Sequence, residues 1–250
     1  MADFEIGFIN ASKRHFPDAQ QKGCFFHFSQ CLWRKVQDNT EVAQKYKDDE
    51  FALNLRQVPA LAFVPAHTVI TSFETLMGSD FFTDNEQLLM PFVDYFEDVW
   101  IGRPKRGGGR RQPLFAHGIW NTFNSTTDGT WFCCTYSNPI HIIYALMWIY
   151  NFVITGNART NNSVEGWNRR FSSLVGADHP SLWKFIDKLK EEQNYTEFRL
   201  NQAAAGAPPP PRRLKYRELE TRLTNLVSQF NTKERIDYLS GIAMNISFHV

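Results

Sequence analysis

Hydrophobic residues in the first half of the chain recur at intervals of three and four positions, which is the spacing of one helix face. Phe4, Phe8 and Ala11 begin this pattern between residues 3 and 16. The same spacing predicts further helices over 29–46, 49–57, 67–78 and 85–99. This half of the chain is therefore predicted to be mainly α-helical.

One aromatic run interrupts the helical pattern. Residues 23–28 read Gly-Cys-Phe-Phe-His-Phe, so apolar and aromatic side chains follow a glycine without helical gaps. A short run of this kind is typical of a buried strand. The sequence predicts a lone strand at 23–28.

A capping box marks a helix start in the second half of the chain. Asn162 is a good N-cap residue, and Glu165 follows three positions later, where its carboxylate can reach the backbone amide of the cap. A helix is therefore predicted to open within Arg159–Phe171. Pro180 predicts the first turn of the next helix, whose buried stripe would include Leu182 and Phe185.

The last fifty residues follow a proline-rich stretch. Residues 201–214 contain four consecutive prolines and predict an extended linker. Beyond it, residues 215–250 show two amphipathic stretches, which predict a pair of helices packed as a hairpin or against a partner. Such helices are also candidates for self-association into a homo-oligomer.

Composition describes a globular chain without a dominant charge. The 250 residues are 43% hydrophobic and 21% charged, enough for one sizeable core or two modest ones. A net charge of +1 supplies no overall attraction to nucleic acid. The cysteines at 24, 31, 133 and 134 show no disulfide framework, which indicates a reducing compartment.

A basic, glycine-rich stretch departs from this neutral background. Residues 103–113 hold three consecutive glycines, no acid and five cations, and they predict a flexible loop. Two interpretations stay open: a solvated linker, or an arm that contacts phosphates through Arg103, Lys105, Arg106, Arg110 and Arg111.

A second unusual stretch carries no charge at all. Residues 129–158 contain no acidic or basic side chain other than His141, and 139–156 approach the length of about 20 apolar residues that spans a bilayer. A buried core segment is favoured over a membrane helix. A third hypothesis is an insert foreign to the fold, such as a retained intron.

The order of several motifs resembles the Mutator-like element transposases. The string from Asp3 onward leads to the Cys24-x-x-His27 motif, and the Asn161-Asn162-x-x-Glu165 block follows much later. Residues 29–128 resemble the helical insertion that this family carries before its glutamate helix. The resemblance covers about 1–128 and 157–200.

The resemblance implies a ribonuclease H-like catalytic domain in which three carboxylates hold two divalent ions, Mg²⁺ or Mn²⁺. Such ions stabilise the attacking and leaving oxygens of strand cleavage. Asp3 matches the second acid and Glu165 the third, while the first acid and the first strands have no counterpart. A vestigial triad that holds metal weakly and no longer transfers strands is therefore expected.

Cys24 and His27 are the remaining metal candidates. They match half of a zinc site in the family motif, but a structural zinc takes four ligands. Zinc binding is therefore not expected.

The resulting prediction is a mainly α-helical chain with a partial ribonuclease H-like domain, a helical insertion and a C-terminal helical pair. Its function would be that of a degenerate transposase fragment in the nucleus, which binds DNA or a partner through the basic loop and the terminal helices. Arg169 and Arg170 are further candidates for contacts to nucleic acid. The alternatives are a non-enzymatic helical interaction protein, intracellular and with Glu165 only a cap, and a membrane-anchored protein. The predicted segments are a core remnant at 1–37, the insertion at 38–128, the uncharged insert at 129–158, closing helices at 159–200, the linker at 201–214 and the helical pair at 215–250.

Overall fold

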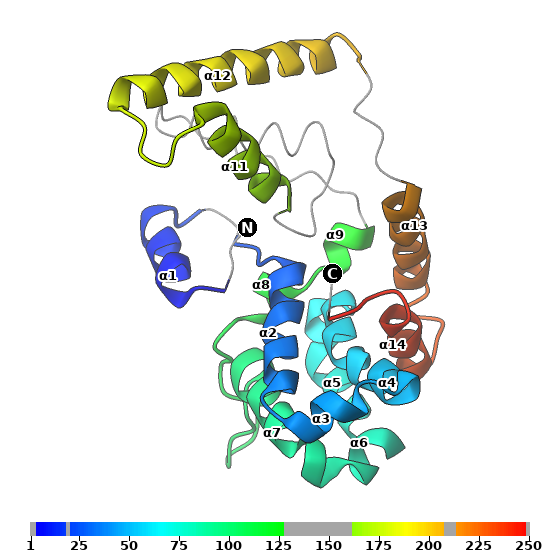
Figure 1. Ribbon diagram of the computed structural model, residues 1–250. Helices are drawn as coiled ribbons and strands as arrows, with labels where there is room; N and C mark the ends of the chain where they lie inside the picture. The colour runs from blue at the N-terminus through cyan, green and yellow to red at the C-terminus, as the bar shows by residue number, and fades with distance from the viewer. Residues whose placement is uncertain (1–3, 19–20, 128–161, 208–213, 249–250) are drawn as a thin grey trace. The chain divides into compact units, whose positions relative to one another are not determined.

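The protein is mainly α-helical, as its hydrophobic spacing predicts (Figure 1). The computed structural model describes residues 4–18, 21–127, 162–207 and 214–248. No β-strand forms within these ranges. They divide into two compact units, of which the first contains the described residues up to 127 together with 214–248, and the second contains 162–207.

The first unit is a packed array of short helices joined by tight connections. Many of the connections are one to four residues long, so neighbouring helices along the chain also pack together. Its elements are α1 (Ile6–His15), α2 (Phe25–Gln37), α3 (Thr40–Lys45), α4 (Asp49–Ala60), η1 (Leu61–Phe63), η2 (Ala66–Thr68), α5 (Val69–Met77), α6 (Asp80–Asp84), α7 (Glu86–Phe96), the π-helical turn η3 (Glu97–Ile101), α8 (His117–Trp120), α9 (Phe123–Thr127), α13 (Leu214–Ser228) and α14 (Arg235–Ala243).

An aromatic cluster around α2 forms the core of this unit. Phe28 is fully buried; its ring stacks on Trp120 at 5.0 Å and meets Trp100 edge-on at 4.9 Å, both between centroids. Phe4 inserts its ring against Trp100 at 4.9 Å and against Phe115 at 5.2 Å. Edge-on contacts of this kind add to the free energy gained by removing the rings from water.

The strand predicted at 23–28 is wrong, because Phe25 begins α2 and Cys24 is its N-cap residue. Phe25, Phe28 and Leu32 are three and four positions apart, so a helix buries all of them on one face. A short apolar run has no period of its own, and the stripe that continues into the next turns decides its conformation.

The helix predicted over 29–46 is divided in two. Asn39 ends the continuous stretch, since its side-chain oxygen accepts hydrogen bonds from the amides of Glu41 at 3.0 Å and Val42 at 3.3 Å. This is an N-cap, and α3 starts at the next residue. Position 37 is the predicted boundary between the core remnant and the helical insertion. The residues on both sides of it pack in one unit, in which α2 lies against α3, α4 and α7.

Distant polar side chains make a buried connection possible after α4. Leu61, Phe63 and Val64 are almost fully buried in the η1 segment, where unpaired carbonyls would be costly. The side-chain amide of Asn121 donates to the Val64 carbonyl at 2.6 Å, and the Tyr238 hydroxyl donates to that of Phe63. These bonds fix the centre of the unit.

The two C-terminal helices complete the first unit. Helix α14 lies against α4 and α5, while α13 lies against α9 and α14. Leu223 and Val227 of α13 and Leu239 and Ile242 of α14 are buried there. The predicted helical pair is thus packed on helices of its own chain, and self-association through it stays a prediction.

The buried phenol of Tyr238 should make the protein less stable at alkaline pH. Its burial raises the pKa of the phenol in the folded protein. In the unfolded chain a tyrosine has a pKa of about 10. Above that pH the unfolded state loses the proton first, so the free energy of unfolding falls by up to about 1.4 kcal/mol per pH unit. Below it this contribution is fully present.

Tyr238→Phe tests this linkage. The variant leaves the Phe63 carbonyl without its donor, which costs about 1–3 kcal/mol near neutral pH. Urea unfolding at about pH 8 and about pH 11 should show the gap between wild type and variant narrowing by about 1 kcal/mol at the higher pH. Tyr46 and Tyr95 are present in both proteins, so their contributions to the pH dependence cancel in the comparison. A difference in the free energy of unfolding that does not change with pH contradicts the prediction.

Within its described residues, the second unit contains two helices, α11 (Asn162–Val175) and α12 (Leu182–Ala204). The predicted helix opening in Arg159–Phe171 is confirmed by α11. Trp167 and Phe171 stack at 5.0 Å, and Phe171 meets Phe185 edge-on at 5.8 Å. The stripe expected to be buried on α12 is nevertheless exposed at Leu182 and at Phe185.

The face that α12 buries also carries polar residues. Glu192 and Thr196 are both buried, one helical turn apart. They lie on the same side of the helix as Phe185, seven and eleven positions after it. The Glu192 carboxylate accepts hydrogen bonds from Trp167 and Arg170. Helix α12 also continues to Ala204, into the segment predicted as linker.

The uncharged segment 129–158, with its hypotheses of a membrane helix and of an insert, lies outside the described residues. Among the helices that the structure describes, none is long and apolar enough to cross a membrane.

Candidate functional site

The basic stretch folds into a hairpin, called here the basic hairpin (residues 103–111). The Arg111 amide donates to the Arg103 carbonyl at 2.8 Å, and the Lys105 amide donates to the Gly109 carbonyl at 2.9 Å. Between these bonds, Pro104 and Arg110 form an isolated antiparallel bridge. The flexible loop expected from composition therefore has a defined backbone.

Arg110 fastens one end of the basic hairpin to the helices beneath it. Its guanidinium binds Glu97 at 2.6 Å and Glu74 at 2.9 Å, and donates to the Gly102 carbonyl at 2.8 Å. Burial disfavours the charge, but the two carboxylates outweigh burial and raise the pKa of Arg110. Its side chain is 14% exposed, so this cation is largely used within the protein.

Arg103 fastens the other end. It forms ion pairs with Asp94 at 3.1 Å and with Asp98. The hydrogen bond from Arg103 holds the pKa of Asp98 below its usual value. Lys105, Arg106 and Arg111, in contrast, are exposed. The structure thus separates the five predicted phosphate contacts into two anchored and three exposed cations.

Replacing Arg110 tests its role as an anchor. Arg110→Ala removes the partner of Glu97, whose side chain is only 19% exposed, and should lower the free energy of unfolding by about 1–3 kcal/mol. Arg111→Ala, one position away and exposed, should change it by less than about 0.5 kcal/mol. Urea denaturation measures both, and equal losses would show that Arg110 does not hold the hairpin.

A second group of cations lies on α11. Arg170 forms an ion pair with Glu192 and lies over the Tyr195 ring at 4.5 Å from the centroid. The Trp167 indole donates to the same Glu192 carboxylate at 2.8 Å. Arg170 therefore ties α11 to α12, whereas Arg169 beside it is exposed.

The acids that bind these arginines were not predicted from the sequence. Glu97 precedes Arg110 by thirteen positions and Glu192 follows Arg170 by twenty-two, so neither pair has a local signal. Glu192 follows Phe185 by seven positions and so lies on the side of α12 that the apolar stripe turns inward, which is the one signal in the sequence for a buried acid there.

Cys24 and His27 stand one helical turn apart at the start of α2. The Cys24 side chain is fully buried, and His27 is half-buried. Within the described ranges no group of three or more His, Cys, Asp or Glu side chains lies close enough to hold a metal ion. Zinc binding at this pair gains no further ligand from these residues.

The two candidate catalytic acids fall outside what can be placed. Asp3 precedes the first described residue. Glu165 belongs to α11, but its side chain is not among those described. Their catalytic assignment stays a prediction.

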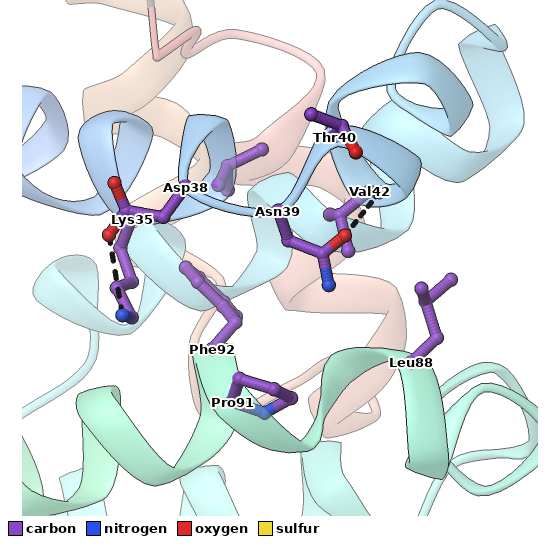
Figure 2. A pocket seen from close by; sticks show the side chains of 9 residues that line it. Lys35, Asp38, Asn39, Thr40, Val42, Leu88, Pro91 and Phe92 are labelled. Atoms are coloured by element: carbon purple, nitrogen blue, oxygen red, sulfur yellow. Dashed lines mark hydrogen bonds and ion pairs between the residues drawn. The ribbon is translucent and has the colours of Figure 1, made fainter.

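A surface pocket of about 310 Å³ lies between the end of α2, the start of α3 and α7 (Figure 2). Lys35 and Asp38 at its edge form an ion pair at 3.3 Å, and Asn39 caps α3. Leu88, Pro91 and Phe92 form its apolar side. None of the predicted site residues lines it.

No protein-family model matches the chain, and comparisons with curated proteins and with solved structures found no significant match.

Proposed function

We propose that this chain is a degenerate fragment of a Mutator-like DNA transposase that binds DNA without transferring strands. The observation that carries the proposal is the order of the Asp3 string, the Cys24-x-x-His27 motif and the Asn161-Asn162-x-x-Glu165 block along the sequence. The helical packing of residues 29–127 supports the proposal, since a helical insertion is expected there. A nuclear location belongs to the same proposal.

The partial ribonuclease H-like domain of this proposal lacks the strand expected from the sequence. In the segment at 23–28 that would supply a strand, the residues from Phe25 onward belong to helix α2. Counterparts of two carboxylates, Asp3 and Glu165, do not make a three-acid site for Mg²⁺ or Mn²⁺. No chemical step is therefore assigned to a metal.

A nicking assay tests the absence of cleavage. The full chain is incubated with supercoiled plasmid and Mg²⁺ or Mn²⁺, and no nicked product is expected. Metal-dependent nicking that disappears in Glu165→Gln would overturn this part of the proposal, because only a working carboxylate would be lost in that variant.

DNA binding is tested by its dependence on salt. A protein that neutralises phosphates releases counterions, so its affinity for duplex DNA falls as salt rises. Binding of a random-sequence duplex, measured by fluorescence anisotropy between about 50 and 200 mM salt, should show a clear negative slope of log affinity against log salt. Absent or salt-independent binding would overturn the proposal.

One observation favours the second candidate, a helical interaction protein with no role at nucleic acid. Arg103, Arg110 and Arg170 are bound to carboxylates of their own chain. If all the predicted cations serve the fold in this way, the basic hairpin is a structural clamp. The salt dependence of DNA binding separates the two candidates.

A further inference from the structure

The basic hairpin combines a fastened base with an open tip. At the base, Arg103 and Arg110 are held by acids of α5, α7 and η3. Gly102, which immediately precedes it, has a left-handed φ of 92°, and its amide donates to the Glu97 carbonyl at 2.6 Å. The backbone is therefore fixed where the hairpin meets the helices.

The space beside the three glycines of the tip is empty. A Cβ atom added at Gly107, Gly108 or Gly109 meets no atom within 4 Å. Gly108 and Gly109 have φ values of 92° and 71°, so glycine is needed there for the reversal of the chain. An extended anion can approach this backbone closely.

Exposed cations flank the open tip. Lys105 and Arg106 precede the three glycines, and Arg111 follows Arg110 on the returning side. Four acids close to the base, Glu74, Asp94, Glu97 and Asp98, are bound to the two anchoring arginines. With four acids and two arginines the base is net negative, so the positive charge available to a ligand lies at Lys105, Arg106 and Arg111. Arg111 is also close enough to Asp98 to help lower the pKa of that carboxyl.

We propose that Lys105, Arg106 and Arg111 contact successive backbone phosphates of DNA, while Arg103 and Arg110 only position the hairpin. This inference rests on the proposed DNA binding and assigns the contacts within it. Because the hairpin is already fastened in the free protein, little loop entropy is lost on binding. Five cations of one loop therefore play two different roles.

The number of phosphate contacts is measured by the salt slope. Each neutralised phosphate contributes about 0.9 to the slope of log affinity against log salt. The variant Lys105→Ala/Arg106→Ala/Arg111→Ala should lower the slope by about 2–3 relative to the wild-type full chain. The control Lys13→Ala/Arg14→Ala/Lys47→Ala makes the same charge change at exposed positions elsewhere in the unit and should leave the slope unchanged.

Single variants separate contact from positioning. Arg111→Ala should lower the slope by about 1. Arg110→Ala should reduce affinity several-fold and leave the slope within about 0.3, because it loosens the hairpin without removing a phosphate contact. Circular dichroism of each variant at the binding temperature shows that the helices are retained.

The outcomes distinguish this inference from the function on which it rests. Wild-type chain that binds with a steep slope, together with a triple variant whose slope equals that of the control, overturns the inference and leaves DNA binding in place. A slope that falls as much in Arg110→Ala as in Arg111→Ala also overturns it. Wild-type chain that does not bind the duplex at about 50 mM salt overturns both.

Discussion

Phe28→Ala should lower the free energy of unfolding by about 3–5 kcal/mol. The ring is fully buried, stacks on the Trp120 indole and meets the Trp100 indole edge-on, with Phe96 also close by. Alanine leaves a cavity that three large rings cannot fill without leaving their rotamers. Since domains are stable by about 5–15 kcal/mol, a large share of the folded state's margin is lost.

Phe8→Ala is the matched control. Phe8 lies on α1 and is 56% exposed, so the same truncation should change stability by less than about 0.5 kcal/mol. Urea unfolding followed by tryptophan fluorescence measures both variants, since Trp100 and Trp120 belong to the core cluster. Similar losses in both would mean that the aromatic cluster is not the centre of the unit.

Gly102→Ala should lower the free energy of unfolding by about 2–3 kcal/mol. Gly102 has a φ of 92°, and an added Cβ would collide with the Arg111 carbonyl oxygen across the base of the basic hairpin. That oxygen belongs to the backbone, so it cannot rotate away. The substitution should also displace the Gly102 carbonyl that binds Arg110.

Gly107→Ala is the control for this effect. Gly107 lies in the same hairpin, its φ is outside the left-handed region, and an added Cβ meets nothing within 4 Å. The free energy of unfolding of the Gly107→Ala variant should stay within about 0.5 kcal/mol of wild type. Thermal unfolding of the two variants under one set of conditions decides the matter, and an equally large shift at Gly107 would contradict the explanation.

Helices with a long apolar stripe could be predicted from the sequence. Leu89, Phe92 and Phe96 are buried on α7, and their spacing allows only one face to turn inward. The predicted helices at 49–57 and 67–78 are likewise confirmed by α4 and α5. In each case local spacing and tertiary burial favour the same structure.

Features that depend on distant partners could not be predicted. In the aromatic run at 23–28, which is helical from Phe25 onward, Phe28 packs against Trp100 and Trp120, and both lie far along the chain. Arg110 and Arg170 resemble free cations in the sequence because Glu97 and Glu192 are not adjacent to them. A cation becomes an anchor only when the fold brings an acid to it.

The cations of the candidate site could be predicted from the sequence, but which of them anchor the hairpin and which are exposed could not. Five cations without an acid are visible in composition alone, so the sequence indicates this stretch as a distinct feature, but it predicts a flexible loop where the structure has a hairpin. Its division into base and tip depends on Glu74 and Asp94, whose distance from it in sequence conceals their proximity. Asp3 and the Glu165 carboxylate lie outside the described residues, and their assignment continues to rest on the motif order.

The position of α14 has a consequence for synthesis. Helix α14 makes the most extensive contact between two helices in the described part of the chain, and its partner is α4, early in the sequence. All of the second unit leaves the ribosome between them. At about 5–20 residues per second this delay is on the order of ten seconds. During it the side of α4 that α14 covers stays exposed, although α2 and α5 already lie against α4. The nascent chain should therefore be a substrate for chaperones until its last helices emerge.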